Sequence, residues 1–176
     1  MVQYGGDEVS ALVVDIGTST LRAGYAGDDT PKAIIPTSYG FIPGSSISGG
    51  DVTMAEAGAE VTEDEKQKEA ISKMFIGQHG PSIWREGMEI GNPMKDGLIN
   101  DFNPIPALIG HALRDVMHCN PEEHPIIVTE PAWNTTANRE RLAEIMFEEF
   151  NVPAFYIANT GVLNAWVPAR HASGLD

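Results

Sequence analysis

The chain has 176 residues and a mass of 19.0 kDa, a size that fits one domain or one domain carrying an insertion. Hydrophobic residues make up 42% of it, enough for a core, and no run approaches the roughly 18 uninterrupted apolar residues of a membrane span. The formal net charge of -14 disfavours direct binding of nucleic-acid phosphates, and a single cysteine, Cys119, excludes a disulfide framework.

The first third of the chain predicts a β-meander. Its first ten residues carry neither a basic region nor an apolar run, so no secretory signal is expected. Residues 10–16 are apolar and β-branched, which predicts a strand buried on both faces, and residues 20–26 and 32–36 predict two more strands. Because the connections are rich in Gly, Ser, Asp and Pro, we expect a hairpin followed by a third strand.

Residues 40–91 differ in composition from the segments on either side. They are rich in Gly, Ser and acidic residues, and within them only residues 63–75 have a helical composition. We interpret this stretch as an insertion with mobile loops. Its acidic run is expected to be a solvated helix face, with a partner-binding surface as the alternative.

The second half of the chain predicts alternating helices and strands. Residues 104–119 and 137–150 have amphipathic helical spacing, and the Asn and Thr side chains of "NTTAN" can cap the second helix. Residues 124–130 and 154–158 predict strands, and a last helix starts at Thr160 and ends at Pro168. The expected fold class is therefore α/β, with a mixed sheet that is antiparallel at first and parallel where helices cross over.

The turn at residues 15–22 is a candidate phosphate-binding site. Successive backbone N–H groups and hydroxyls can be aimed at one anion there, and Arg22 adds a cation within reach. Asp15, at the end of a buried strand, can hold Mg²⁺ through water. An ordinary hairpin with a β-bulge is the alternative, because so short a turn is weakly specific. The candidate ligands are Asp15, Gly17, Thr18, Ser19, Thr20 and Arg22.

Histidines offer a weaker candidate. His111 and His118 lie on one face of one predicted helix, and Cys119 adjoins them. No paired Cys or His-Glu-x-x-His spacing accompanies them, and all three border a core stripe. Structural roles are therefore favoured over a metal site.

Several long segments resemble actin, in actin's order. They are "DIGTST", "AGYAGDDTPKAIIP", "PEEHPIIVTE" and "ANRERLAEIMFEEFNVPAFYIA". The resemblance covers residues 8–173 apart from the middle insertion. The opening "YGGDEVSALVVDIG" and the tryptophan of "TEPAWN" are similar to the nuclear actin-related protein 4 branch of that family, which includes the actin-like component of BAF remodelling complexes.

The resemblance implies the actin/Hsp70/hexokinase-like ATPase fold (ribonuclease H-like), with ATP and Mg²⁺ in a cleft between two halves. This chain would correspond to the first half, with a mixed five-stranded sheet and flanking helices. Residues 1–39 and 92–176 resemble subdomain 1, and residues 40–91 occupy subdomain 2. A second phosphate turn follows in the family near Asp176, to which no role is assigned here.

The sequence also departs from the actin pattern at the nucleotide site. Arg22 replaces the family's phosphate-binding lysine, and Thr18-Ser19 replaces a Ser-Gly pair. Thr160 stands where hydrolytic actins carry a glutamine that orients the attacking water, and a threonine is too short to do so. We expect ATP to bind, with Thr160 beside it, and to be hydrolysed very slowly or not at all. The alternative for Thr160 is a helix N-cap.

The branch resemblance implies a nuclear scaffold subunit of chromatin-remodelling and histone acetyltransferase complexes, with ATP and Mg²⁺ as structural ligands. Its implied partners are monomeric nuclear actin and a helical segment of the large subunit. Contact with histones or nucleosomes is left open, whereas direct sequence-specific nucleic-acid binding and membrane binding are not expected. Trp166, in "VLNAWVPAR", matches the border of a partner groove in the family, with core packing as its alternative.

Residues 40–91 do not resemble the loop by which actin subunits grip each other, so filament formation is not expected. The competing hypothesis is an ATP-hydrolysing, filament-forming cytoskeletal protein. A sugar kinase of the same superfamily is a third alternative. It would need an acidic residue that faces the sugar and acts as the base, and no segment resembles one.

Overall fold

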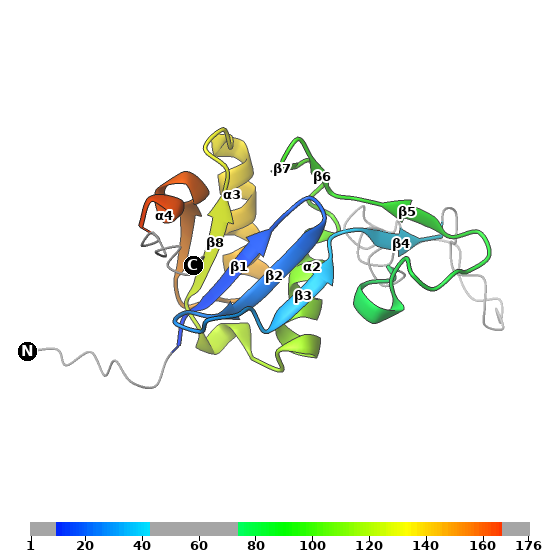
Figure 1. Cartoon of the computed structure of the whole chain (residues 1–176), viewed down its shortest axis with the longest axis horizontal. Helices are drawn as coiled ribbons and strands as arrows, with labels where there is room; N and C mark the ends of the chain where they lie inside the picture. The colour runs from blue at the N-terminus through cyan, green and yellow to red at the C-terminus, as the bar shows by residue number, and fades with distance from the viewer. Residues whose placement is uncertain (1–9, 43–73, 167–176) are drawn as a thin grey trace, which may run out of the picture.

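The structure is a computed structural model that describes residues 10–42 and 74–166. Its centre is a five-stranded sheet with the strand order β3-β2-β1-β8-β9 (Figure 1). The mixed α/β architecture expected from the sequence is therefore confirmed. No helix within the described ranges is long and apolar enough to cross a membrane.

The strands pair as the meander and the crossovers predict. The first three are antiparallel, β8 pairs in parallel with β1, and β9 pairs in parallel with β8. Their bounds are β1 (Leu12–Ile16), β2 (Thr20–Tyr25), β3 (Ala33–Pro36), β8 (Ile126–Glu130) and β9 (Phe155–Asn159).

One face of this sheet packs against helices and the other does not. In β1, Leu12, Val14 and Ile16 are buried, whereas Val13 and Asp15 are only half-buried. The expectation that this strand is buried on both faces is therefore wrong. Figure 1 shows why: α2 (Ile105–Gly110) and α3 (Thr136–Glu144) both lie behind the sheet, and no described helix covers β1, β2 and β3 in front.

Both predicted amphipathic helices form, but each changes its winding halfway. The first continues from α2 into π-helical turns, η2 (His111–Val116), and the second continues from α3 into η4 (Ile145–Glu149). Bonds from the Met117 N–H to Ala112 O (3.0 Å) and from the Phe150 N–H to Ile145 O (3.3 Å) close these wider turns. The predicted apolar stripe is the core, and its fully buried members include Ile105, Leu108, Ile109, Ala112 and Leu113.

Two details of these helices can be compared with expectation. Thr135 caps α3 by accepting a hydrogen bond from the Asn138 N–H at 3.2 Å, as "NTTAN" predicts. His118 lies beyond the end of η2 with a φ of 55°, so it does not share a helix with His111 as expected. Cys119 is buried, and its Sγ donates to Leu113 O. A 3-10 turn, η3 (Pro121–Glu123), then leads into β8.

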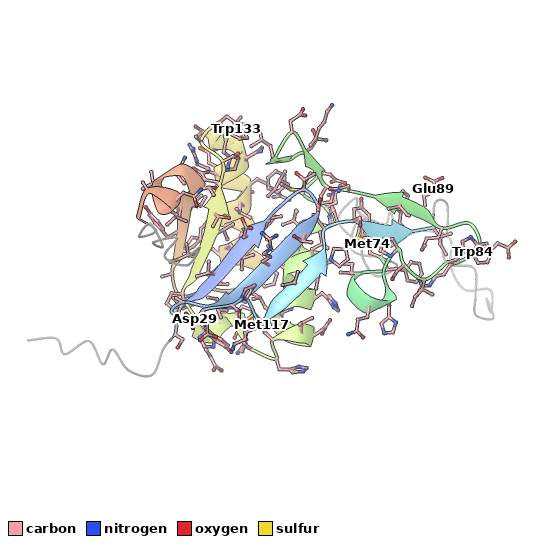
Figure 2. All side chains as sticks on the ribbon, in the orientation of Figure 1. Asp29, Met74, Trp84, Glu89, Met117 and Trp133 are labelled. Carbon is pink, nitrogen blue, oxygen red and sulfur yellow. The ribbon has the colours of Figure 1, made fainter. Side chains whose placement is uncertain are left out.

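The middle segment forms an arm that extends away from the main sheet (Figure 1), and the side chains of Met74, Trp84 and Glu89 lie on it (Figure 2). Its described part contains β4 (Tyr39–Phe41) paired with β5 (Glu89–Gly91), and the 3-10 turn η1 (Gly77–His79). Residues 63–73 of the predicted helix lie outside the described residues. Phe75 forms a β-bridge with Gly40, so the helix does not reach its predicted end. The subdomain boundaries themselves stay a prediction.

A short hairpin links the arm back to the core. β6 (Met94–Lys95) and β7 (Leu98–Ile99) are joined by Asp96 and Gly97, whose φ angles are 53° and 77°. An Asp-Gly pair with positive φ at both residues is a favoured two-residue hairpin turn. Sequence reasoning missed this hairpin, although the Asp-Gly signal was present.

Candidate functional site

The candidate site lies where the parallel strands end. The carboxyl ends of β1, β8 and β9 reach one edge of the sheet, and Figure 1 shows the β1–β2 turn, the loop before α3, and α4 (Thr160–Trp166) following from them. Ligands of open α/β sheets bind outside the carboxyl ends of the strands. The sequence therefore places its candidate turn at the edge that this rule selects.

The β1–β2 turn is fixed through its carbonyl oxygens. Gly17 O accepts a hydrogen bond from Thr37 Oγ1 at 2.7 Å, and Ser19 O accepts one from the Thr37 N–H at 3.0 Å. Thr18 O accepts a third from Asn92 Nδ2 at 2.9 Å. Thr37 is completely buried. All three carbonyls of the turn are therefore engaged by the segments that lead into and out of the arm.

Two residues of the same turn, Thr18 and Ser19, have donors that no described residue engages. Thr18 and Ser19 are exposed, and within the described part of the chain neither their N–H groups nor their hydroxyls make a hydrogen bond. The Gly17 N–H closes the turn on Thr20 O at 3.0 Å, and a side chain at Gly17 would lie 2.9 Å from that oxygen. A turn with bonded carbonyls and unpaired N–H groups fits an anion such as a phosphate.

Asp15 and Arg22 face each other beside this turn. They are direct cross-strand partners in β1 and β2, and Arg22 Nη1 lies 3.5 Å from Asp15 Oδ2. The second carboxylate oxygen, Oδ1, accepts a hydrogen bond from Thr129 Oγ1 of β8. Arg22 is thus close enough to serve an anion at the turn. Asp15, predicted to hold Mg²⁺ through water, has both oxygens engaged by the protein, an arrangement that suits the metal poorly.

Thr160 is the first residue of α4, next to the end of β8. Its Oγ1 donates a hydrogen bond to Glu130 O at 2.6 Å. Asn159 Oδ1 accepts from the Gly161 N–H at 2.9 Å, so Asn159 provides the helix cap that was considered for Thr160. The hydroxyl of Thr160 is therefore committed to the sheet.

The same edge holds a buried ion pair that sequence reasoning missed. Glu130 is 8% exposed and accepts hydrogen bonds from Arg139 Nε and Nη2, both at 2.8 Å, and from Asn134 Nδ2 at 2.8 Å. The hydrogen bonds from Arg139 lower the pKa of Glu130, and burial opposes them. Glu130 thereby fixes the start of α3 against the end of β8, while its carbonyl holds Thr160.

The structure brings most predicted site residues to one edge. Asp15, the residues of the turn, Arg22 and Thr160 all belong to segments that meet there. The structure does not describe the side chain of Trp166, so the prediction that Trp166 borders a partner groove stays a prediction. The two histidines are separated, and His111 Nδ1 pairs with Asp115 Oδ2 at 2.7 Å. The residues missed from the sequence are Thr37, Asn92, Thr129 and Glu130.

This geometry defines an α/β domain with a donor-bearing β1–β2 turn at the carboxyl edge of a mixed sheet. The family model described as Actin matches residues 6–175, and the chain belongs to the actin family.

Similar relatives carry the name actin-related protein 4. The chain is 40% identical over 179 residues to actin-related protein 4 of Oryza sativa subsp. indica, covering 97% of this chain and 40% of the relative. It is 39% identical over 173 residues to that of Arabidopsis thaliana, covering 97% and 39%. Actin-related protein 4A of Arabidopsis thaliana is 39% identical over 138 residues, covering 78% of this chain and 93% of the relative. The chain thus spans about two fifths of the length of the first two relatives.

Thr37 offers a test of how the turn is held. Replacing Thr37 with valine keeps the volume but removes the donor to Gly17 O, which we expect to lower the free energy of unfolding by about 1–2 kcal/mol. The affinity for nucleotide should fall as well, because the turn loses one of its three anchors. Urea unfolding and nucleotide titration measure both effects. Thr30→Val, at an exposed position, is the matched control and should change neither.

Proposed function

We propose that this protein is a non-catalytic, ATP-binding actin-related scaffold subunit of nuclear chromatin-remodelling and histone acetyltransferase complexes. The free donors of Thr18 and Ser19, together with Arg22, support phosphate binding at the β1–β2 turn. Membership of the actin family supports ATP as the ligand. ATP would stabilise the folded protein by about 2.7 kcal/mol at a hundredfold excess over its Kd, because it binds only the folded state.

The hydrogen bond from Thr160 to Glu130 O carries the non-catalytic part of the proposal. Phosphoryl transfer to water depends on a side chain that holds the water in line with the terminal phosphate. A glutamine reaches out with both a donor and an acceptor, whereas Thr160 is shorter and gives its one proton to the backbone of β8. Because Thr160 does not hold the water, we expect ATP to persist as a structural ligand.

Partners and location follow from the actin-related protein 4 resemblance. Monomeric nuclear actin, bound side by side on a helical segment of a large subunit, is the proposed principal partner, with histones or nucleosomes as further ones. The net charge of -14 favours working through proteins over gripping DNA directly. Self-assembly into filaments is not part of the proposal, since residues 40–91 do not resemble the filament-forming loop.

Phosphate release from the protein at its native length, with saturating ATP and Mg²⁺, tests the proposal. We expect no turnover above the protein-free background and no sedimentable polymer. Thr160→Gln should raise phosphate release above wild type, whereas Thr160→Ser, which keeps the hydroxyl bond to Glu130 O, should not.

Wild-type turnover comparable to that of polymerising actin, abolished by Asp15→Ala, would contradict the scaffold role. Such turnover together with sedimentable polymer would support the competing hypothesis of a filament-forming ATPase.

A further inference from the structure

The Asp15–Arg22 pair helps to decide whether an arginine or a divalent cation balances the charge of a bound phosphate. The β1–β2 register places the two residues directly opposite each other, one residue pair away from the turn. It lies 3.5 Å from Asp15 Oδ2, and the side chains are 54% and 40% exposed. Arg22 is therefore both close to the turn and open to an incoming ligand.

A divalent cation finds less favourable surroundings at this edge. Mg²⁺ is usually held, with its waters, by one or two carboxylates. Asp15 Oδ2 already pairs with Arg22, and Asp15 Oδ1 accepts a hydrogen bond from Thr129. Glu130, at the end of the neighbouring strand β8, points to the opposite, helix-covered face, where its oxygens accept from Arg139 and Asn134, so it is not available to a cation beside Asp15. The carboxylate of Asp15 is thus already paired with arginine, and the guanidinium of Arg22 repels a second cation.

Arginine suits the role that the metal would otherwise play. Its guanidinium stays protonated at every relevant pH, and its fork of N–H donors matches the oxygens of a phosphate. Only Nη1 of Arg22 faces Asp15, so the other N–H donors of this 54% exposed side chain can bind a phosphate while the pair with Asp15 persists.

We propose that Arg22 supplies the positive charge for the phosphates, so that the protein binds a nucleoside triphosphate without requiring a divalent cation. This inference rests on the proposed ATP binding, and it departs from the family expectation of a Mg²⁺ held by Asp15. It concerns binding and is independent of any turnover.

Equilibrium titration of the protein at its native length with fluorescent etheno-ATP tests this, in excess Mg²⁺ and in excess EDTA. The wild-type Kd should change less than about threefold between the two conditions. Arg22→Gln should weaken binding in EDTA at least about tenfold, and Mg²⁺ should restore part of that loss. Arg141→Gln, which removes an equally exposed arginine paired with Glu144, is the matched control and should behave as wild type.

A second variant keeps the test informative if Arg22→Gln folds poorly. Asp15→Asn should tighten binding in EDTA about threefold, because it removes a negative charge beside the phosphates and releases Arg22. Weaker binding of Asp15→Asn in Mg²⁺ would contradict the proposal. A wild-type affinity that falls more than about tenfold in EDTA would overturn it while leaving ATP binding intact. No binding in either condition would overturn this inference and the ATP-binding proposal together.

Discussion

Replacing Glu130 with glutamine is expected to lower the free energy of unfolding by about 2–3 kcal/mol at pH 7. Glutamine keeps the shape of the side chain but not its charge, and its amide nitrogen cannot accept, so one of the two 2.8 Å hydrogen bonds from Arg139 is lost and the other loses its ionic component. Arg139 is 39% exposed and stays partly hydrated, which keeps the loss below that of a fully buried pair. Urea unfolding followed by circular dichroism measures the change.

The same pair predicts a pH dependence. Arg139 lowers the pKa of Glu130 below its ordinary 4.5, so the stabilising contribution is fully present above that pH. It is lost as the pH falls through the folded-state pKa. Wild type should therefore lose its advantage over Glu130→Gln in acid. Glu144→Gln, at the exposed pair with Arg141, should cost under about 1 kcal/mol at pH 7. Equal stability of wild type and Glu130→Gln at neutral pH would contradict this account.

Truncating Leu113 to alanine should cost about 2–5 kcal/mol. Leu113 is fully buried in η2, which packs against β2 and β3. Its removal leaves a cavity beneath β2, which carries Arg22, and beneath β3, which leads directly into Thr37. Val116→Ala, at a 39% exposed position of the same π-helical segment, is the matched control and should cost under about 1 kcal/mol. Similar losses in both variants would show that η2 is not packed as described.

The order of the main elements could be predicted from the sequence because their signals are local. β1 and β8 are apolar runs, and the helices begin at Pro104 and Thr135 with an apolar stripe. The π-helical continuations were not predictable, because the apolar spacing that predicts an α-helix does not distinguish a wider turn. The strands β4 and β5 are only three residues each, too short for an alternation pattern.

In the candidate site as well, the residues that are contiguous in sequence were predicted and those that are distant in sequence were not. Its turn is contiguous in sequence, so its residues were identified together. The anchors of the turn were not, since Thr37 lies 20 residues from Gly17 and Asn92 lies 74 residues from Thr18. Thr129 contacts Asp15 across 114 residues. Contacts of this kind exist only once the sheet has formed, so no local sequence pattern predicts them.

Thr160 shows what the structure adds to a substitution seen in the sequence. The family resemblance identified the position, and a helix cap was the competing interpretation. The geometry gives the cap to Asn159 and directs the Thr160 hydroxyl to Glu130 O. Because the Thr160 hydroxyl is bonded to the backbone of β8, it is not free to position a water molecule. This is the physical basis of the proposal that the protein does not hydrolyse ATP.

The central claim is that the protein holds ATP without hydrolysing it, and one measurement tests it most directly. The protein at its native length, freed of nucleotide, is loaded with less than one equivalent of ATP labelled in its adenine ring, and quenched in acid after an overnight incubation. Slow product release cannot hide hydrolysis in this single-turnover form. We expect the protein-bound label to be recovered as ATP. Recovery of the bound label as ADP would contradict the claim.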